Sequence, residues 1–370
     1  MLTGKHGGHA AVRANAGTVA LAAEDASLAQ ILKNAGYRTG GFGKWGLGDA
    51  GSSGAPTNKG FDEFFGYLHQ THAHTYYPEF LWDNQRRVDL AKGAYSADLI
   101  ARRSFDFIDR HRNQPFFLYA TYTLPHGNFE GPDTKPYTDA PWPEPSKHLA
   151  AMITRADGYV GEILRRLREY RLDSDTLVIL SSDNGAPSGP GNSLELFRRN
   201  GALRANKGTV YEGGIRVPAI VRWPGRVKSN AVSSTPWGFV DFVPTLADVA
   251  GAKAPAGLDG VSMAAHLKGG SAPKREYLYW EQNQFNIPKQ QFNPEGFSAA
   301  VRVDNWKLVQ PPKGAPLELY DLAGDPAESK NLAAANPAVT RRLAGILKSA
   351  RTEPRPHKGG RREHNESWSE

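Results

Sequence analysis

The sequence predicts an α/β protein: a mixed, mostly parallel sheet with helices on both faces, plus a small C-terminal antiparallel sheet with a helix. Apolar stretches at 116–122 and 176–180 are short enough to be buried strands. Between them, 147–170 repeats apolar residues at helical spacing. Strand, helix and strand in this order are typical of a parallel sheet. Beyond residue 270, short strand-like stretches follow one another until a helix predicted at about 337–350, which favours antiparallel pairing.

The length of 370 residues is enough for one large domain and a smaller one. We expect a large α/β domain over 1–270, a C-terminal α+β subdomain over 271–350 and a disordered tail over 351–370, which is polar, charged and interrupted by Pro and Gly. Apolar periodicity predicts further elements in the large domain. The helices are expected at 27–36 and 96–112, and the strands at 37–42 and 218–223.

Composition narrows the class of protein. The net charge is +7, from 45 Lys and Arg against 38 Asp and Glu, which fits an acidic ligand, nucleic acid or simple solubility equally well. The basic residues are scattered, and we expect no nucleic-acid module. The chain has no Cys, so disulfides and thiolate metal sites are excluded. No apolar run approaches the roughly 20 residues of a transmembrane helix. Nothing in the sequence indicates an oligomeric state.

A polar pair follows one of the predicted buried strands. Asp183 and Asn184 come directly after the apolar stretch at 176–180. Open α/β sheets bind ligands at the carboxyl ends of their strands, and carboxylate and amide oxygens are the ligands that hard divalent cations prefer. The Asp-Asn-Gly run also fits an ordinary turn. The lysine-bearing segment downstream favours a metal site next to an anionic, oxygen-rich substrate.

Three basic side chains are predicted at the same edge of the sheet. Lys207 lies in a glycine-rich segment just before a strand, and Lys44 lies between glycines just after one. His126 follows Pro125, which ends a strand, so its side chain should project at the edge that carries Asp183. A lone lysine in a glycine loop is usually solvated, and a strand-end histidine can be structural. Together these residues suggest an anion-binding cleft.

An aromatic and histidine-rich stretch at 60–77 is interpreted as a loop whose aromatic residues pack it onto the domain. Gln70, His72 and His74 are its candidate substrate contacts. Histidines at alternate positions could also bind a ligand, although surface histidines that bind nothing are more common.

These segments resemble the arylsulfatase-type sulfatases of the alkaline-phosphatase-like superfamily. The stretch 36–45 is similar to the family's second signature, 124–126 matches its Pro-His after a strand, and 182–185 resembles its metal-ligand pair. The stretch 207–218 is similar to its lysine-bearing segment, and 319–332 resembles the end of its C-terminal sheet. The likeness extends over nearly the whole chain up to about residue 350, with the motifs in the family's order.

The resemblance implies a sulfuric ester hydrolase that cleaves a sulfate monoester, in nature often one of a carbohydrate. It implies one Ca²⁺ with Asp183 and Asn184 among its ligands, Lys44 and Lys207 on the sulfate oxygens, and His126 at the ester oxygen or leaving group. The nucleophile would be a formylglycine made from Cys or Ser. Two ligands from one turn leave most of calcium's six to eight oxygens to water, so calcium should bind weakly.

The departures from the family pattern also carry expectations. Met1-Leu2-Thr3-Gly4 fits only the end of the first signature, so the formylglycine and the strand with paired aspartates are expected upstream of residue 1. We therefore expect a truncated chain that is inactive as written. Gly46 stands where many members have a histidine. A signal peptide in the missing segment would place the full protein in the periplasm or outside the cell.

Three alternatives remain at this point. A phosphodiesterase or phosphonate-ester hydrolase of the same superfamily would carry a different first signature. A non-catalytic protein could use Lys44, Lys207 and His126 to bind sulfated glycans. The chain could also be an unstable fragment, because loss of a central strand exposes two strand edges.

Overall fold

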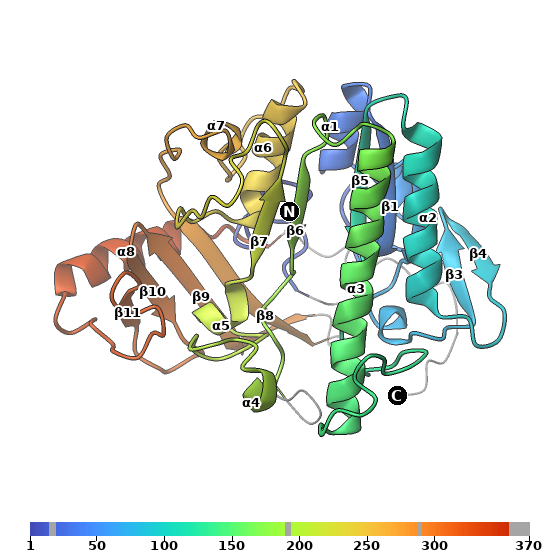
Figure 1. Cartoon of the computed structure of the whole chain (residues 1–370). Helices are drawn as coiled ribbons and strands as arrows, with labels where there is room; N and C mark the ends of the chain where they lie inside the picture. Colours follow the sequence, from blue (N-terminus) through green and yellow to red (C-terminus); the bar gives the residue numbers. More distant parts are fainter. Residues whose placement is uncertain (15–19, 189–193, 287–290, 355–370) are drawn as a thin grey trace.

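The computed structural model describes residues 1–14, 20–188, 194–286 and 291–354. Figure 1 shows a five-stranded sheet and a four-stranded sheet at opposite ends of the molecule, with a two-stranded sheet between them. The mixed α/β architecture with a small C-terminal antiparallel sheet agrees with the sequence prediction. The tail predicted to be disordered lies, from residue 355 on, outside the described residues.

The five-stranded sheet has the order β4-β3-β2-β1-β5. β1 pairs in parallel with both β2 and β5, whereas β2–β3 and β3–β4 are antiparallel. The register places Lys44, the last residue of β1, opposite Tyr67, the last residue of β2. The strands are β1 (Arg38–Lys44), β2 (Glu63–Tyr67), β3 (Phe80–Asp83), β4 (Arg86–Asp89) and β5 (Phe116–Thr121).

The interpretation of 60–77 as one loop was wrong, because β2 runs through it. The aromatic side chains of Phe64 and Phe65 point to opposite faces of the sheet, and each is buried under a different set of helices. A strand covered on both faces has no alternating apolar pattern, which makes it difficult to recognise in a sequence. The β3–β4 hairpin, with Asn84 in the left-handed region (φ 57°), was also not predicted.

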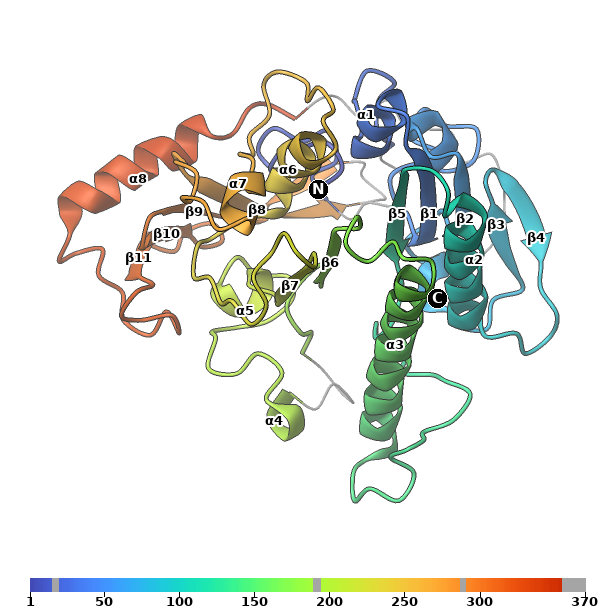
Figure 2. The ribbon, with the colours of Figure 1, turned by 45° about the horizontal axis from the view of Figure 1, so that its top comes forward.

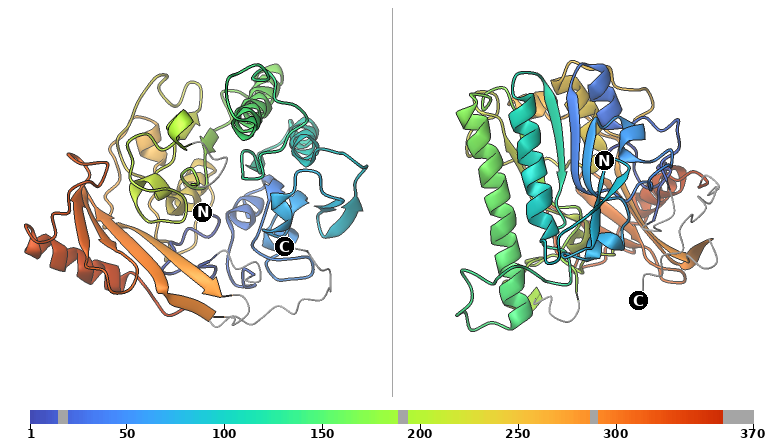
Figure 3. Two further views of the ribbon diagram at one scale, coloured as in Figure 1. Left: turned by 90° about the horizontal axis from the view of Figure 1, so that it is seen from below. Right: turned by 90° about the vertical axis from the view of Figure 1, so that its right-hand side faces the viewer.

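Helices cover both faces of this sheet. Figure 3 shows α2 (Ser96–His111) and α3 (Glu144–Glu169) side by side on one face. The other face is covered by α1 (Leu28–Asn34) and α6 (Phe242–Val249), which contact each other. The Oγ atom of Ser27 caps α1 by accepting a hydrogen bond from the backbone N–H of Gln30 at 3.1 Å.

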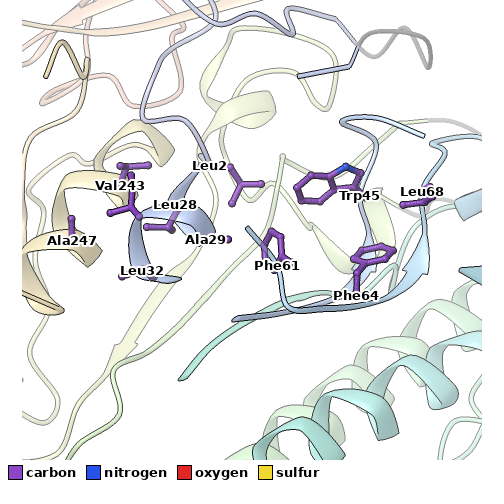
Figure 4. Close-up of a cluster of buried hydrophobic side chains, with 11 residues drawn as sticks. Leu2, Leu28, Ala29, Leu32, Trp45, Phe61, Phe64, Leu68, Val243 and Ala247 are labelled. Atoms are coloured by element: carbon purple, nitrogen blue, oxygen red, sulfur yellow. The ribbon is translucent and has the colours of Figure 1, made fainter. Parts of the chain in front are cut away.

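The main hydrophobic core lies between α1, α6 and the sheet. Figure 4 shows Trp45 and Phe61 in this core beside Leu2, so the first residues of the chain are part of it. The rings of Trp45 and Phe61 are almost perpendicular, with their centroids 5.5 Å apart. The buried members are Leu2, Leu28, Ala29, Ile31, Leu32, Trp45, Phe61, Phe64, Leu68, Val243 and Ala247.

The parallel pairing expected between the strands on either side of α3 is not formed. β5 pairs with β1, whereas β6 (Val178–Ser181) pairs with the antiparallel strand β7 (Ala219–Arg222) in a separate sheet. Leu180 in β6 is 43% exposed and Ile220 in β7 is 58% exposed. β6 still ends beside the candidate site, but its hydrogen-bonded partner is the next strand in sequence.

The C-terminal sheet is antiparallel throughout, as predicted, with the order β11-β10-β9-β8. α8 packs on one face through Leu343 and Leu347, and Figure 2 shows it along the outer side of this sheet. The elements are β8 (Leu278–Asn286), β9 (Gln291–Val303), β10 (Trp306–Gln310), β11 (Glu318–Asp321) and α8 (Pro337–Ser349).

The remaining helices are single turns in the connections. None of the helices in the described ranges is long and apolar enough to cross a membrane. The short helices are α4 (Leu194–Phe197), α5 (Glu212–Ile215), α7 (Ala264–Leu267), and the 3₁₀ turns η1 (Pro56–Lys59), η2 (His72–His74) and η3 (Phe239–Asp241).

Candidate active site

Lys44 reaches the site because β1 and β5 run unusually close together at their ends. Gly43 has a φ of +127°, and a Cβ at this position would lie 2.0 Å from the carbonyl oxygen of Thr121. The hydroxyl of Thr121 donates a hydrogen bond to the carbonyl of Lys44 at 2.8 Å. Only glycine fits such an approach. The close contact fixes the backbone of Lys44 where the strand leaves the sheet.

His126 is held by its backbone and by a second histidine. The hydroxyl of Tyr76, which is fully buried, donates to the carbonyl oxygens of Thr123 at 3.0 Å and His126 at 3.2 Å. The imidazole of His126 stacks on that of His74, with ring centroids 4.5 Å apart and planes inclined by 13°. This arrangement fixes the direction of the His126 ring.

Lys207 is brought to His126 by a tight connection between two loops. The backbone N–H of Gly185 donates to the carbonyl of Gly214 at 3.0 Å, and the N–H of Lys207 donates to that of Ala186 at 3.1 Å. These bonds join the loop after β6 to the glycine-rich segment. They place the ammonium nitrogen of Lys207 3.4 Å from Nε2 of His126.

The pKa shifts show that Lys44 and Lys207 lie close enough to repel each other. The pKa of Lys44 is lowered, first by partial removal from water and then by the charge of Lys207, while Asp183 acts in the opposite direction. Burial, followed by Lys207, Lys44 and His74, lowers the pKa of His126 to about 4. Burial and the two lysines also lower the pKa of His74. The cluster therefore favours an anion, which would relieve this repulsion.

The predicted metal ligands lie on the exposed side of this cluster. Asp183 is exposed, and the side-chain amide of Asn184 donates to the carbonyl of Gly185 at 3.0 Å, which leaves its oxygen available. Within the described ranges, Asp183 belongs to no group of three His, Asp or Glu side chains. The pair offers hard oxygens of the type that calcium prefers, but only a small part of a full coordination shell.

The three predicted substrate contacts are placed differently. His74 belongs to the cluster through its stack on His126. Gln70 lies against Gly46: a Cβ there would be 1.9 Å from the side-chain nitrogen of Gln70, which therefore takes the space of any side chain at 46. His72 is buried, and its ring lies 4.9 Å from that of Tyr67 and 4.4 Å from that of Phe80, a position suited to packing.

Sequence reasoning missed the residues that support the cluster from behind. Tyr76 positions the backbone of His126, and Thr121 positions that of Lys44. Asn200 accepts from the N–H of Ala186 at 3.0 Å and donates to the carbonyl of Ala205 at 3.0 Å, so it braces the loop that carries Lys207. Tyr76 lies in the aromatic stretch at 60–77. The acceptors of its hydroxyl lie about fifty residues away in the chain, so no local pattern could have identified this contact.

Two lysines and two histidines thus lie together beside the ends of β1 and β5, and the Asp-Asn pair follows β6 of the neighbouring sheet, in a mixed α/β protein whose site suits an anion. The chain belongs to the sulfatase family. The family model described as Sulfatase matches residues 1–252, and a model described as N-sulphoglucosamine sulphohydrolase, C-terminal, matches residues 205–353.

Individual relatives agree with this assignment. The chain is 29% identical to an N-acetylgalactosamine-6-O-sulfatase of Bacteroides thetaiotaomicron over 291 residues, which are 74% of this chain and 55% of the relative. It is 28% identical to human arylsulfatase A over 86% of this chain and 70% of that protein. The crystal structure of Ps i-CgsB with k-i-k-neocarrahexaose superimposes with a TM-score of 0.80 at 26% identity, over 95% of this chain and 81% of that one. The chain spans about half the length of the first of these relatives.

Proposed function

We propose that this chain carries the substrate-binding groups of a sulfuric ester hydrolase that cleaves a sulfate monoester of a carbohydrate. The convergence of Lys44, Lys207 and His126 carries the proposal. A sulfate ester presents three terminal oxygens and one negative charge, and two lysines can contact these oxygens. The carbohydrate part rests on the names of an N-acetylgalactosamine-6-O-sulfatase relative and of a neighbour solved with a neocarrahexaose.

Each residue has a specific task in this proposal. Lys44 and Lys207 hold the terminal sulfate oxygens and stabilise the charge that develops in the transition state. His126 is uncharged near neutral pH, because its pKa is about 4. Its uncharged ring can lie against the ester oxygen, and the ammonium of Lys207, 3.4 Å from Nε2, is a proton source for the departing alcohol.

Two groups that the family resemblance implies complete the proposal. Asp183 and Asn184 would contribute two oxygens to a calcium site, and the ion would offset the charge of the sulfate. A formylglycine would supply the oxygen nucleophile. The chain's own residues bind and orient the ester and manage the proton at its bridging oxygen.

The test separates binding from turnover. Binding of N-acetylgalactosamine 6-sulfate and of the unsulfated sugar is measured by calorimetry, and sulfate release is measured by ion chromatography. We expect the sulfated sugar alone to bind. The Lys44→Ala and Lys207→Ala variants should each lose most of this binding, and any turnover should fall by about 10²–10³-fold, as for removal of one transition-state contact. Lys147→Ala serves as control, because the side chain of Lys147 forms an ion pair with Glu144 in the first turn of α3.

Several outcomes would contradict the proposal. Equal binding of the sulfated and unsulfated sugars would show that the lysines do not select the sulfate. Faster cleavage of a phosphonate ester than of a sulfate ester would indicate a phosphonate-ester hydrolase of the same superfamily. Selective binding with no sulfate release from any ester, measured in a longer protein that includes the first signature and is shown by mass spectrometry to contain formylglycine, would indicate a glycan-binding protein.

A further inference from the structure

A second histidine cluster lies outside the active site, in the first turn-rich segment of the chain. His6 and His9 are three residues apart, and their rings stack with centroids 4.4 Å apart. Both contact Asp259: the backbone N–H of His6 donates to Oδ2 at 2.9 Å, and Nδ1 of His9 lies 2.8 Å from Oδ1. One potential ligand atom from each of the three side chains lies within 4.8 Å of the others.

His6 is the unusual member of this cluster. Its side chain is only 5% exposed, and neither of its ring nitrogens has a hydrogen-bond partner among the described residues. Its Nε2 atom lies 3.8 Å from Oδ2 of Asp259, which is too far for a hydrogen bond. A buried polar atom without a partner costs about 1–3 kcal/mol. Such an atom in a folded protein calls for a water molecule or an ion that completes its contacts.

Packing alone does not account for this histidine. The ring of His6 lies 4.8 Å from that of Tyr279 and 5.9 Å from that of Tyr277, so its faces are well covered. An apolar ring would fill the same space without leaving two nitrogens unpaired.

The cluster lies where three parts of the chain meet. The N–H of Asp259 donates to the carbonyl of Gly4 at 3.0 Å, and that of Thr352 donates to the carbonyl of Gly8 at 3.1 Å. A Cβ at Gly8 would lie 2.2 Å from the carbonyl oxygen of Ala350, so the N-terminal segment lies tightly against the end of α8. An ion held here would fasten the first residues to the large domain and to the C-terminal sheet.

We propose that His6, His9 and Asp259 form a structural site for a divalent transition-metal ion of the zinc type. Two imidazole nitrogens and one carboxylate oxygen are donors that zinc accepts readily, whereas calcium requires oxygens. Bonds of about 2.0–2.1 Å around a tetrahedral ion place ligand atoms roughly 3.3 Å apart. The three atoms must therefore close from their present separation of up to 4.8 Å. None of its ligands belongs to the proposed calcium site, where Asp183 and Asn184 offer oxygens.

The experiment uses the full chain, freed of metal with a chelator and dialysed. Calorimetric titration with Zn²⁺ should show one site, and the melting temperature should rise with Zn²⁺. Addition of Co²⁺ should produce visible absorption bands of a nitrogen- and oxygen-coordinated ion. His9→Gln and Asp259→Asn, which keep side chains of similar size, should each weaken binding at least about tenfold and remove the cobalt bands.

The control is His266→Gln, since His266 contacts Ser233 and the carbonyl of Gly270, outside the cluster. It should leave the zinc affinity and cobalt spectrum unchanged. No binding by a folded chain, or binding that His9→Gln and Asp259→Asn leave intact, would overturn the proposal. Should either variant fail to fold, the cobalt spectrum of the unmodified chain decides: bands typical of coordination by water alone would also overturn it.

Discussion

Lys307 and the pair formed by Lys44 and Lys207 have opposite electrostatic surroundings. Lys307, in the C-terminal sheet, is completely buried, with its ammonium nitrogen 2.9 Å from Oε1 of Glu212 and 2.8 Å from Oε1 of Glu328. Lys44 and Lys207 are half-buried and face each other, and a histidine lies 3.4 Å from Lys207. Lys307 therefore lies next to negative charge, whereas Lys44 and Lys207 bring positive charges together.

The difference separates a structural ion pair from a binding site. Glu212 belongs to α5, just downstream of Lys207, and its backbone N–H donates to Glu328 at 2.7 Å. Lys307 therefore joins the lysine-bearing segment of the large domain to the C-terminal sheet, and its charge is already compensated. Among the described residues, Asp183 is the acidic group that counteracts the repulsion between Lys44 and Lys207. Uncompensated charge held in place by the backbone is what an anionic substrate needs.

The largest expected effect comes from removal of the compensated lysine. The Lys307→Met variant should lose about 3–5 kcal/mol of unfolding free energy, because it leaves two buried carboxylates next to each other. Urea unfolding followed by fluorescence measures the loss. Lys313→Met is the matched control: Lys313 is 70% exposed and 3.9 Å from Glu295, so its pair should contribute under about 1 kcal/mol. Equal losses of unfolding free energy in the two variants would contradict the structural role given to the buried Lys307.

Removal of a lysine from the active site is expected to change the unfolding free energy far less. Lys207→Met removes a repulsive partner of Lys44, so the unfolding free energy should stay within about 0.5 kcal/mol of the original or rise. Millimolar sulfate should raise the melting temperature of the unmodified chain but not that of the variant. The measurements are made against sodium chloride at equal ionic strength, because sulfate also stabilises proteins non-specifically. A destabilisation as large as that of Lys307→Met would assign Lys207 a structural role.

The comparison also shows which features the sequence could predict. Lys44 and His126 could be placed together because each follows a strand, and strand ends on one side of a parallel sheet meet at one edge. The pairing of Lys307 could not be predicted, since Glu212 lies 95 residues away in the chain. β2 was missed because burial on both faces removes the alternation that identifies a strand. The predicted pairing of β6 was wrong, because strand order depends on contacts between distant segments.

The last prediction distinguishes two histidines whose pKa values are both about 4. Burial is the largest cause for both. His69 and Arg87 add to it for His72, which packs on Tyr67 and Phe80, whereas Lys207 and Lys44 add to it for His126. Both pKa values lie below the unfolded value of about 6.5. The unfolded chain therefore binds more protons between pH 6.5 and 4, and stability should fall as the pH falls through this range.

Bound sulfate should raise the pKa of His126 by adding a negative charge beside it, and it should leave that of His72 unchanged. Imidazole titrations followed by NMR, with His72→Leu and His126→Gln used to assign the signals, measure both values. Each variant should also reduce the slope of unfolding free energy against pH, by up to about 1.4 kcal/mol per pH unit for one proton. The slope that remains in His72→Leu should respond to sulfate more strongly than the slope that remains in His126→Gln, where His74 still faces the two lysines. A sulfate effect on His72 as large as that on His126 would show that the anion binds elsewhere, because the lysines that distinguish the two histidines lie beside His126 alone.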